Sequence, residues 1–69
     1  MGAVIGPVES LFATGSGGGW IRVAGRWYQC PGNAAGAILT VAADSRRAGV
    51  PVALYFWKSG SQIVDIQTL

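Results

Sequence analysis

Short apolar segments alternate with glycine, proline and serine along the whole chain, and this spacing favours strands over helices. The segment Ala3–Ile5 is a short apolar piece that is interrupted by Gly6-Pro7. The longer apolar runs predict strands at Val8–Thr14, Trp20–Val23, Arg26–Gln29, Ala37–Ala43, Val50–Lys58 and Gln62–Thr68. Loops or turns are expected at Thr14–Gly19, Ala24-Gly25, Cys30–Gly36, Asp44–Gly49 and Ser59-Gly60.

This pattern predicts an all-β chain that forms a single small domain over residues 1–69. The expected fold is a compact antiparallel barrel or sandwich of about five to six meandering strands. A helix over Ala34–Ala48 is the alternative, because alanine, leucine and arginine favour helices. The β-branched residues Ile38, Thr40 and Val41 favour the strand. A helix there would give an α+β fold instead.

The last predicted hairpin assigns the apolar side chains of its strands to two faces. A two-residue loop at Ser59-Gly60 would pair Phe56 with Ile63 and Leu54 with Asp65. The first face, the expected core face, carries Ala53, Tyr55, Trp57, Val64, Ile66 and Thr68. The second face is also apolar, so we expect it to be an interface between copies of the chain, formed by Val52, Leu54, Phe56, Ile63, Asp65 and Leu69. Asp65 would then need a partner at that interface, or a shifted register that places it in water.

The hairpin around Ala24-Gly25 predicts a second candidate surface. A tight turn places Arg22 opposite Trp27 and Trp20 opposite Gln29, so Trp20, Arg22 and Trp27 share one face. Two indoles beside a guanidinium can stack on sugar rings or nucleobases, which makes this face a candidate ligand platform. The structural alternative is that one tryptophan closes the end of a barrel while the arginine covers the other.

The amino-acid composition favours association with other protein chains over a catalytic or metal-binding role. The chain has five Lys or Arg residues, three Asp or Glu residues, no histidine and one cysteine, while 51% of its residues are hydrophobic. A domain of this size removes only about 60% of its unfolded surface from water, so much apolar surface must stay outside. One cysteine excludes an internal disulfide, and the lack of histidine argues against a zinc site. We therefore expect a homo-oligomer, or docking on a larger assembly.

Candidate catalytic groups are few, and we expect neither an enzyme nor a cofactor. The carboxylates Glu9, Asp44 and Asp65 are scattered along the chain, and no histidine is present to activate the free Cys30. The run Gly15–Gly19 resembles a phosphate loop only superficially, because no Gly-Lys-Ser/Thr follows it. Arg46-Arg47 is interpreted as a solvated turn, with docking of an acidic partner or a phosphate as the functional alternative.

The charge pattern and the N-terminal segment limit the expected partners. A net charge of +2 is low for a protein that binds nucleic acid through phosphates, so nucleic acid is not a favoured partner. The N-terminal segment has no basic stretch followed by a long apolar one, and no run is long enough for a membrane helix. We expect no signal peptide and no membrane partner, which fits a virion or a cytoplasmic location.

The composition is similar to that of small all-β modules of viral particles, such as capsid decoration proteins and fibre tips. That resemblance implies a non-enzymatic structural subunit that self-associates or docks on a larger assembly such as a phage particle. The alternative function is a small binding module: either a lectin-like carbohydrate binder that uses Trp20 and Trp27, or a single-strand nucleic-acid binder with Arg22 and Arg26.

Overall fold

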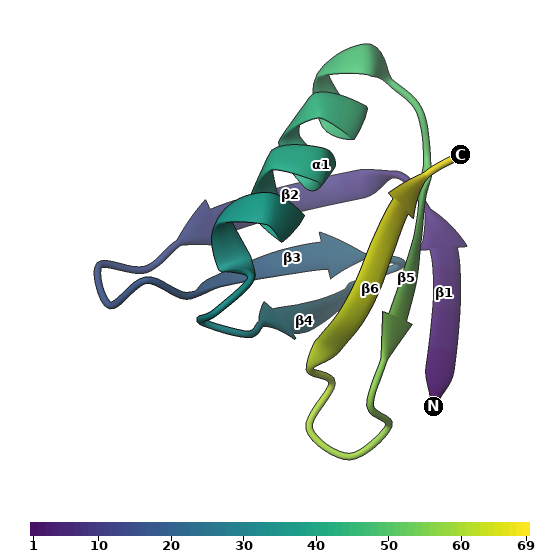
Figure 1. Ribbon diagram of the computed structural model, residues 1–69. Coiled ribbons are helices and arrows are strands. Elements are labelled where there is room, and N and C mark those ends of the chain that lie inside the picture. The colour runs from purple at the N-terminus through teal and green to yellow at the C-terminus, as the bar shows by residue number, and fades with distance from the viewer.

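The computed structural model describes all 69 residues as six strands and one helix. In chain order, the elements are β1 (Gly2–Gly6), β2 (Val8–Ala13), β3 (Gly19–Val23), β4 (Arg26–Cys30), α1 (Ala35–Ala48), β5 (Val52–Phe56) and β6 (Ile63–Thr68). The strands form two antiparallel three-stranded sheets, with the orders β1-β5-β6 and β2-β3-β4. The all-β prediction is confirmed only in part: the chain is mostly β and its strands are antiparallel, but it contains one helix, and the strands form two separate sheets, not one closed barrel. The two sheets run at a steep angle to each other (Figure 1).

A sharp corner in the chain connects the two sheets. Strand β1 ends at Gly6, Pro7 breaks the ladder because it has no N–H to donate, and β2 begins at Val8 in the other sheet. A bulge between Val8 and Ser10 shifts the pairing of β2 with β3. The predicted pieces Ala3–Ile5 and Val8–Thr14 therefore correspond to two strands that belong to different sheets.

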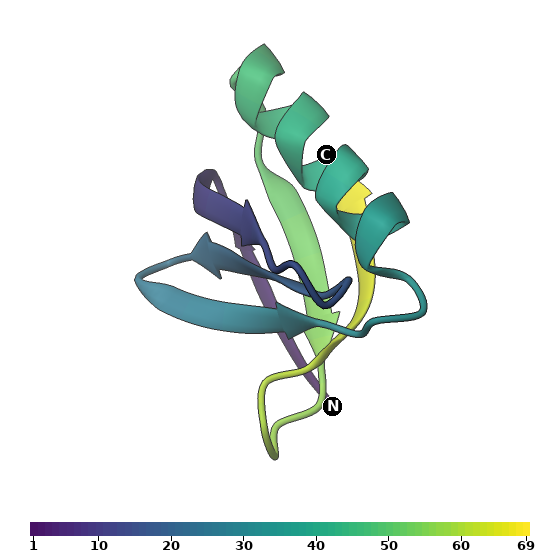
Figure 2. The same cartoon turned by 90° about the vertical axis from the view of Figure 1, so that its left-hand side faces the viewer.

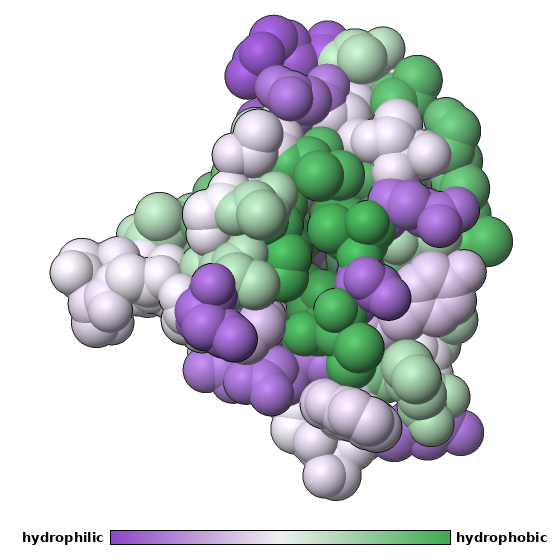
Figure 3. Space-filling view, viewed as in Figure 1, coloured by the Kyte–Doolittle hydropathy of each residue, from purple (hydrophilic) through white to green (hydrophobic).

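The core lies between the two sheets and the helix. Figure 2 shows α1 on one side of the strands, where it packs against both sheets. The rings of Tyr28 from β4 and Phe56 from β5 are 4.7 Å apart, so the two sheets meet directly at this point. Figure 3 shows hydrophobic atoms gathered between α1 and β6, in the middle of that view. The cluster of buried residues consists of Val8, Ile21, Val23, Tyr28, Cys30, Ala35, Ile38, Ala42, Val52, Leu54, Phe56 and Ile63.

The segment after β4 is a helix, so the predicted strand at Ala37–Ala43 is wrong. The alternative of a helix over Ala34–Ala48 is confirmed within one residue. The helix buries Ala35, Ile38, Ala42 and Ser45, whose spacing of three or four residues places them on one face.

The turn predicted at Asp44–Gly49 is also wrong, because most of this segment is the last turn of α1. Residues up to Ala48 are helical, and Gly49 ends the helix in the left-handed conformation, with φ of 73°. The N–H of Gly49 and the N–H of Val50 then donate to the Arg46 and Ser45 carbonyls. A glycine in this conformation followed closely by a proline, here Pro51, is a common helix ending.

Replacing Gly36 with alanine is expected to stabilise the fold. Gly36 lies in the first turn of α1, and a Cβ added there meets no atom within 4 Å. Glycine in a helix loses more conformational freedom on folding than alanine, so the free energy of unfolding should rise by up to about 1 kcal/mol. Urea denaturation followed by circular dichroism measures this change, and a decrease would contradict the helical assignment of Gly36.

The last hairpin pairs Phe56 with Ile63, as predicted, but the register changes beyond that pair. A bulge between Tyr55 and Phe56 adds one residue to β6, so Asp65 lies opposite Tyr55 and Ile66 opposite Leu54. One extra residue moves every later side chain of a strand to the other face. Asp65 is exposed, so the alternative of a shifted register that places it in water is confirmed.

The face assignment of β5 is therefore reversed from the prediction. Four residues expected at an oligomer interface, Val52, Leu54, Phe56 and Ile63, are instead buried in the core of the chain itself. Their side chains lie between the β1-β5-β6 sheet and the rest of the fold. Of the expected core face, Tyr55, Trp57 and Val64 are instead exposed. Leu69, the sixth expected interface residue, is exposed at the end of β6.

Candidate functional site

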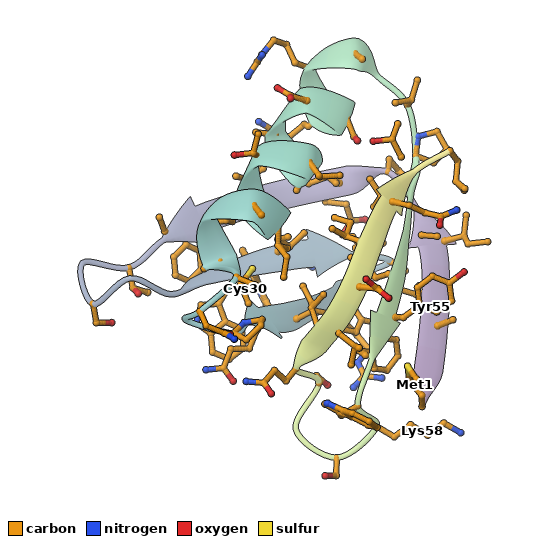
Figure 4. The ribbon with its side chains drawn as sticks, in the orientation of Figure 1. Met1, Cys30, Tyr55 and Lys58 are labelled. Atoms are coloured by element: carbon orange, nitrogen blue, oxygen red, sulfur yellow. The ribbon has the colours of Figure 1, made fainter.

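Large apolar side chains are exposed on the β1-β5-β6 sheet, on the face turned away from the core. Ile5 of β1 is 66% exposed, and Trp57, directly after β5, is 52% exposed. Tyr55 lies opposite Ala3 and Ile5 opposite Ala53, so these side chains share one face. Figure 4 shows Tyr55 projecting from β5 on the side away from α1, with Met1 near the lower end of the sheet. We call Met1, Ala3, Ile5, Tyr55 and Trp57 the apolar outer face.

Strand β1 borders this apolar outer face and is an edge of its sheet. Its backbone pairs only with β5, and no hydrogen bond joins the other side of β1 to any element. Natural edge strands usually carry charged residues, prolines or bulges that discourage further pairing. The sequence of β1, GAVIG, has none of them. The edges formed by β2 and β6 differ, because α1 packs against both.

A second exposed surface lies on the β2-β3-β4 sheet and contains the predicted ligand platform. The predicted register is confirmed, with Arg22 opposite Trp27 and Trp20 opposite Gln29. The structure adds Phe12 of β2, which lies opposite Trp20 and is 46% exposed. Trp27 is also exposed and Trp20 is half-buried. We call Phe12, Trp20 and Trp27 the aromatic platform.

Two rings of the aromatic platform, those of Phe12 and Trp27, contact each other across the middle strand. Phe12 and Trp27 come from the two outer strands of the sheet, and their ring centroids are only 5.4 Å apart in an edge-to-face arrangement. The guanidinium of Arg22 lies over the Trp27 ring, with its carbon 6.0 Å from the ring centroid. These side chains therefore form one continuous apolar surface beside a cation.

Glu9 holds Arg22 at the border of the aromatic platform. Arg22 Nε and Glu9 Oε1 are 3.4 Å apart, and the same oxygen accepts a hydrogen bond of 3.0 Å from the Gly25 N–H. Glu9 is the extra residue of the β2 bulge, which places its carboxylate beside the β3-β4 turn. Sequence reasoning missed Glu9 and Phe12. The alternation of Ser10 and Phe12 in β2 was the available signal for Phe12.

Cys30, the only thiol, lies at the end of β4 inside the core (Figure 4). Burial raises the pKa of this thiol to about 11, because the charged thiolate loses its contact with water. At neutral pH the group is a protonated thiol, which is a weak nucleophile.

The remaining polar candidates lie apart from both surfaces. Arg46 and Arg47 are in the last turn of α1 rather than in a hairpin turn, and they line a shallow depression with Leu11 and Ala43. The Arg47 Nη1 atom is 3.2 Å from Asp44 Oδ1. In the glycine-rich loop, the side chain of Thr14 accepts a hydrogen bond from the Gly18 N–H.

Neither a metal cluster nor a membrane helix is present in the structure. No three residues among the cysteine and the carboxylates lie close enough together to hold a metal ion. The single helix, α1, is too short and too polar to cross a membrane. The chain matches no known protein-family model, no curated protein and no solved structure.

Proposed function

We propose that the protein is a non-catalytic structural subunit that associates with a second copy of itself through the apolar outer face. The observation that carries this proposal is the exposure of Ile5 on β1 and of Tyr55 on β5, together with that of Met1 and Trp57 directly beyond the ends of these strands. Exposed apolar residues grouped in this way are typical of protein interfaces, whereas scattered ones are not.

The distribution of polar residues on this face supports an interface centred on β1 and β5. Asp65 and Gln67 lie on β6, opposite Tyr55 and Ala53, so polar side chains border the apolar outer face along β6. Protein interfaces commonly have an apolar centre and a polar rim. Two copies related by a two-fold axis would bring Ile5 and Tyr55 of each chain together and leave both Asp65 carboxylates in water.

Energetic considerations also support a partner on this face. A stable dimer usually buries about 800 Å² per partner, and the whole chain exposes 3917 Å². A domain of this length is expected to have roughly 3 to 10 kcal/mol of stability, so covering several large apolar side chains would add substantially to it. Such a dimer would be similar to the small all-β subunits of viral particles that the composition resembles.

The positions of the titratable groups support a non-catalytic role. Glu9 is engaged by Arg22 and Gly25, and Asp44 by Arg47. Asp65 is exposed and has no ion-pair partner, and Cys30 is a buried, protonated thiol. No pair of these groups is placed as a nucleophile with its activating base.

The charge substitution Ile5→Lys tests the proposed interface. The unmodified chain is expected to be a dimer at micromolar concentration by size exclusion coupled to light scattering. Ile5 is largely exposed in one chain, so Ile5→Lys should leave the circular dichroism spectrum unchanged. It should weaken the dimer by at least about 2 kcal/mol, roughly 30-fold in Kd, because the ammonium would lose its water.

Two further variants make the test specific. Phe12→Lys changes an exposed apolar residue on the other sheet and should leave the dimer intact. Trp57→Lys changes the apolar outer face outside β1 and should weaken the dimer as Ile5→Lys does. A monomeric unmodified chain, or dissociation by Phe12→Lys alone, contradicts the proposal. Dissociation by Ile5→Lys without any effect of Trp57→Lys would indicate pairing of β1 edges instead of face packing.

A further inference from the structure

The aromatic platform is not needed to complete the core. None of Phe12, Trp20 and Trp27 belongs to the buried cluster, and all three side chains point away from it. Large aromatic side chains on the solvent side of a sheet leave apolar area in water, which favours their use in binding. This surface lies on the other sheet from the apolar outer face, so it does not depend on the proposed dimer.

Hydrogen-bonding groups surround the aromatic platform. Ser10 and Gln29 share the face with the aromatic rings, because they lie opposite Arg22 and Trp20. Glu9 Oε1 accepts the hydrogen bond from the Gly25 N–H and forms the ion pair with Arg22 Nε. Glu9 Oε2 and the two terminal nitrogens of Arg22 have no protein partner. These groups supply an acceptor and several donors at the edge of an apolar surface.

The platform has no net charge. Arg22 is the only basic residue on this face, and Glu9 neutralises it at 3.4 Å. The nearby Arg26 is directed elsewhere, with its guanidinium over Tyr28 and a hydrogen bond to Ser61. A single-stranded nucleic acid would require unpaired cations along its backbone, since phosphate neutralisation supplies much of the binding energy. An uncharged ligand fits the surface better.

We infer that the aromatic platform, together with the Glu9–Arg22 pair, is a binding site for an uncharged carbohydrate chain. A pyranose ring has an apolar C–H face that packs on an indole, and it has hydroxyl groups around its rim that both donate and accept hydrogen bonds. Trp27 and Trp20 provide the stacking surface. Arg22 donates to the hydroxyl oxygens and Glu9 accepts from the hydroxyl groups, and hydrogen bonds to charged groups are stronger than neutral ones.

The experiment titrates the full chain with a β-1,4-linked glucose hexasaccharide and with an N-acetylglucosamine hexasaccharide, and it follows tryptophan fluorescence and calorimetry. A saturable signal with at least one of them is expected, with little change in Kd between low and high salt. A ten-nucleotide deoxythymidine strand is titrated in parallel and should not bind at moderate salt.

Variants locate the site. Trp27→Ala should weaken hexasaccharide binding at least tenfold, and Glu9→Gln should weaken it by a smaller factor. Phe12→Ala serves as a second platform variant in case Trp27→Ala disturbs the fold, which circular dichroism reports. Trp57→Ala is the control, because it removes another exposed indole, one that lies directly after β5 and far from β2, β3 and β4 in the sheet order, and it should leave Kd unchanged.

Three results would overturn the inference. The first is the absence of a signal with both hexasaccharides. The second is binding of the deoxythymidine strand alone, with a Kd that rises steeply with salt, which would make the surface a nucleic-acid site. The third is loss of sugar binding in Trp57→Ala but not in Trp27→Ala or Phe12→Ala.

Discussion

Replacing Leu54 with alanine is expected to lower the free energy of unfolding by about 2 to 5 kcal/mol, the usual cost of truncating a fully buried leucine. Leu54 is in the middle strand of its sheet, opposite Val4 of β1 and Ile66 of β6, and it is completely buried. Truncation leaves a cavity between the sheet and the rest of the core. A domain of this length has a stability of roughly 3 to 10 kcal/mol, so Leu54→Ala should remove a large fraction of it and lower the midpoint of thermal unfolding by many degrees.

The neighbouring residue Tyr55 provides the control for Leu54→Ala. Tyr55 follows Leu54 on β5, but its side chain lies on the apolar outer face and is 38% exposed. Tyr55→Ala should change the stability of the single chain by less than about 1 kcal/mol. Urea denaturation at low protein concentration measures both variants while keeping association out of the comparison. A larger loss for Tyr55→Ala than for Leu54→Ala would mean that the two faces of β5 are assigned in the wrong order.

Replacing Gly19 with alanine is expected to cost about 1 to 3 kcal/mol, the range typical of overpacked sites. A Cβ at this position would lie 2.8 Å from the carbonyl oxygen of Phe12 and 2.8 Å from Cδ1 of Leu39. The Leu39 side chain can rotate away, but the Phe12 carbonyl belongs to the backbone of β2, which pairs with β3. The strand must therefore move, and the platform residues Phe12 and Trp20 move with it.

Gly32→Ala is the matched control for Gly19→Ala. A Cβ at Gly32 meets no atom within 4 Å, and the residue is exposed in the loop before α1. Its stability should stay within about 0.5 kcal/mol of that of the unmodified chain. Thermal unfolding of both variants measures the difference, and equal midpoints would contradict the close approach of β2 and β3 at Gly19.

The register of the β3-β4 hairpin could be predicted from the sequence because its turn is short. Ala24 and Gly25 both have positive φ, as the central residues of a tight two-residue turn require. Such a turn allows one pairing of the strands, so the common face of Trp20, Arg22 and Trp27 follows from counting residues. This part of the candidate site was therefore accessible before the structure.

The faces of the last hairpin could not be derived in the same way. Its loop is longer than Ser59-Gly60, since the Trp57 N–H donates to the Gln62 carbonyl and Ser61 also has positive φ. The bulge that moves Asp65 has no sequence signature, because Val64 suits either position. Strand β5 is apolar at every position, so alternation alone does not distinguish its core face from its outer one.

The helix was only the alternative prediction for a different reason. Its buried face consists mainly of small residues, Ala35, Ala42 and Ser45, with Ile38 as the one large side chain, so the apolar periodicity is weak. Tertiary packing against β2 and β6 selects the helix over the strand that Thr40 and Val41 favour. The contribution of Phe12 to the candidate site could not be predicted, because the loop after β2 leaves the pairing of β2 with β3 open. The contribution of Glu9 could not be predicted because it depends on the bulge in β2.

The pairing of β1 with β5 has a consequence for the order of folding. The two strands come from opposite ends of the chain, so Ala3 can meet Tyr55 only after the chain has closed a loop that contains β2, β3, β4 and α1. Pairings between distant segments form slowly, whereas the β2-β3-β4 meander needs only local contacts. Strand β1 should therefore join last, when the other sheet already exists. The last step of folding and the proposed self-association would then both involve β1. Two chains that associate before β1 has paired with β5 could exchange their β1 strands.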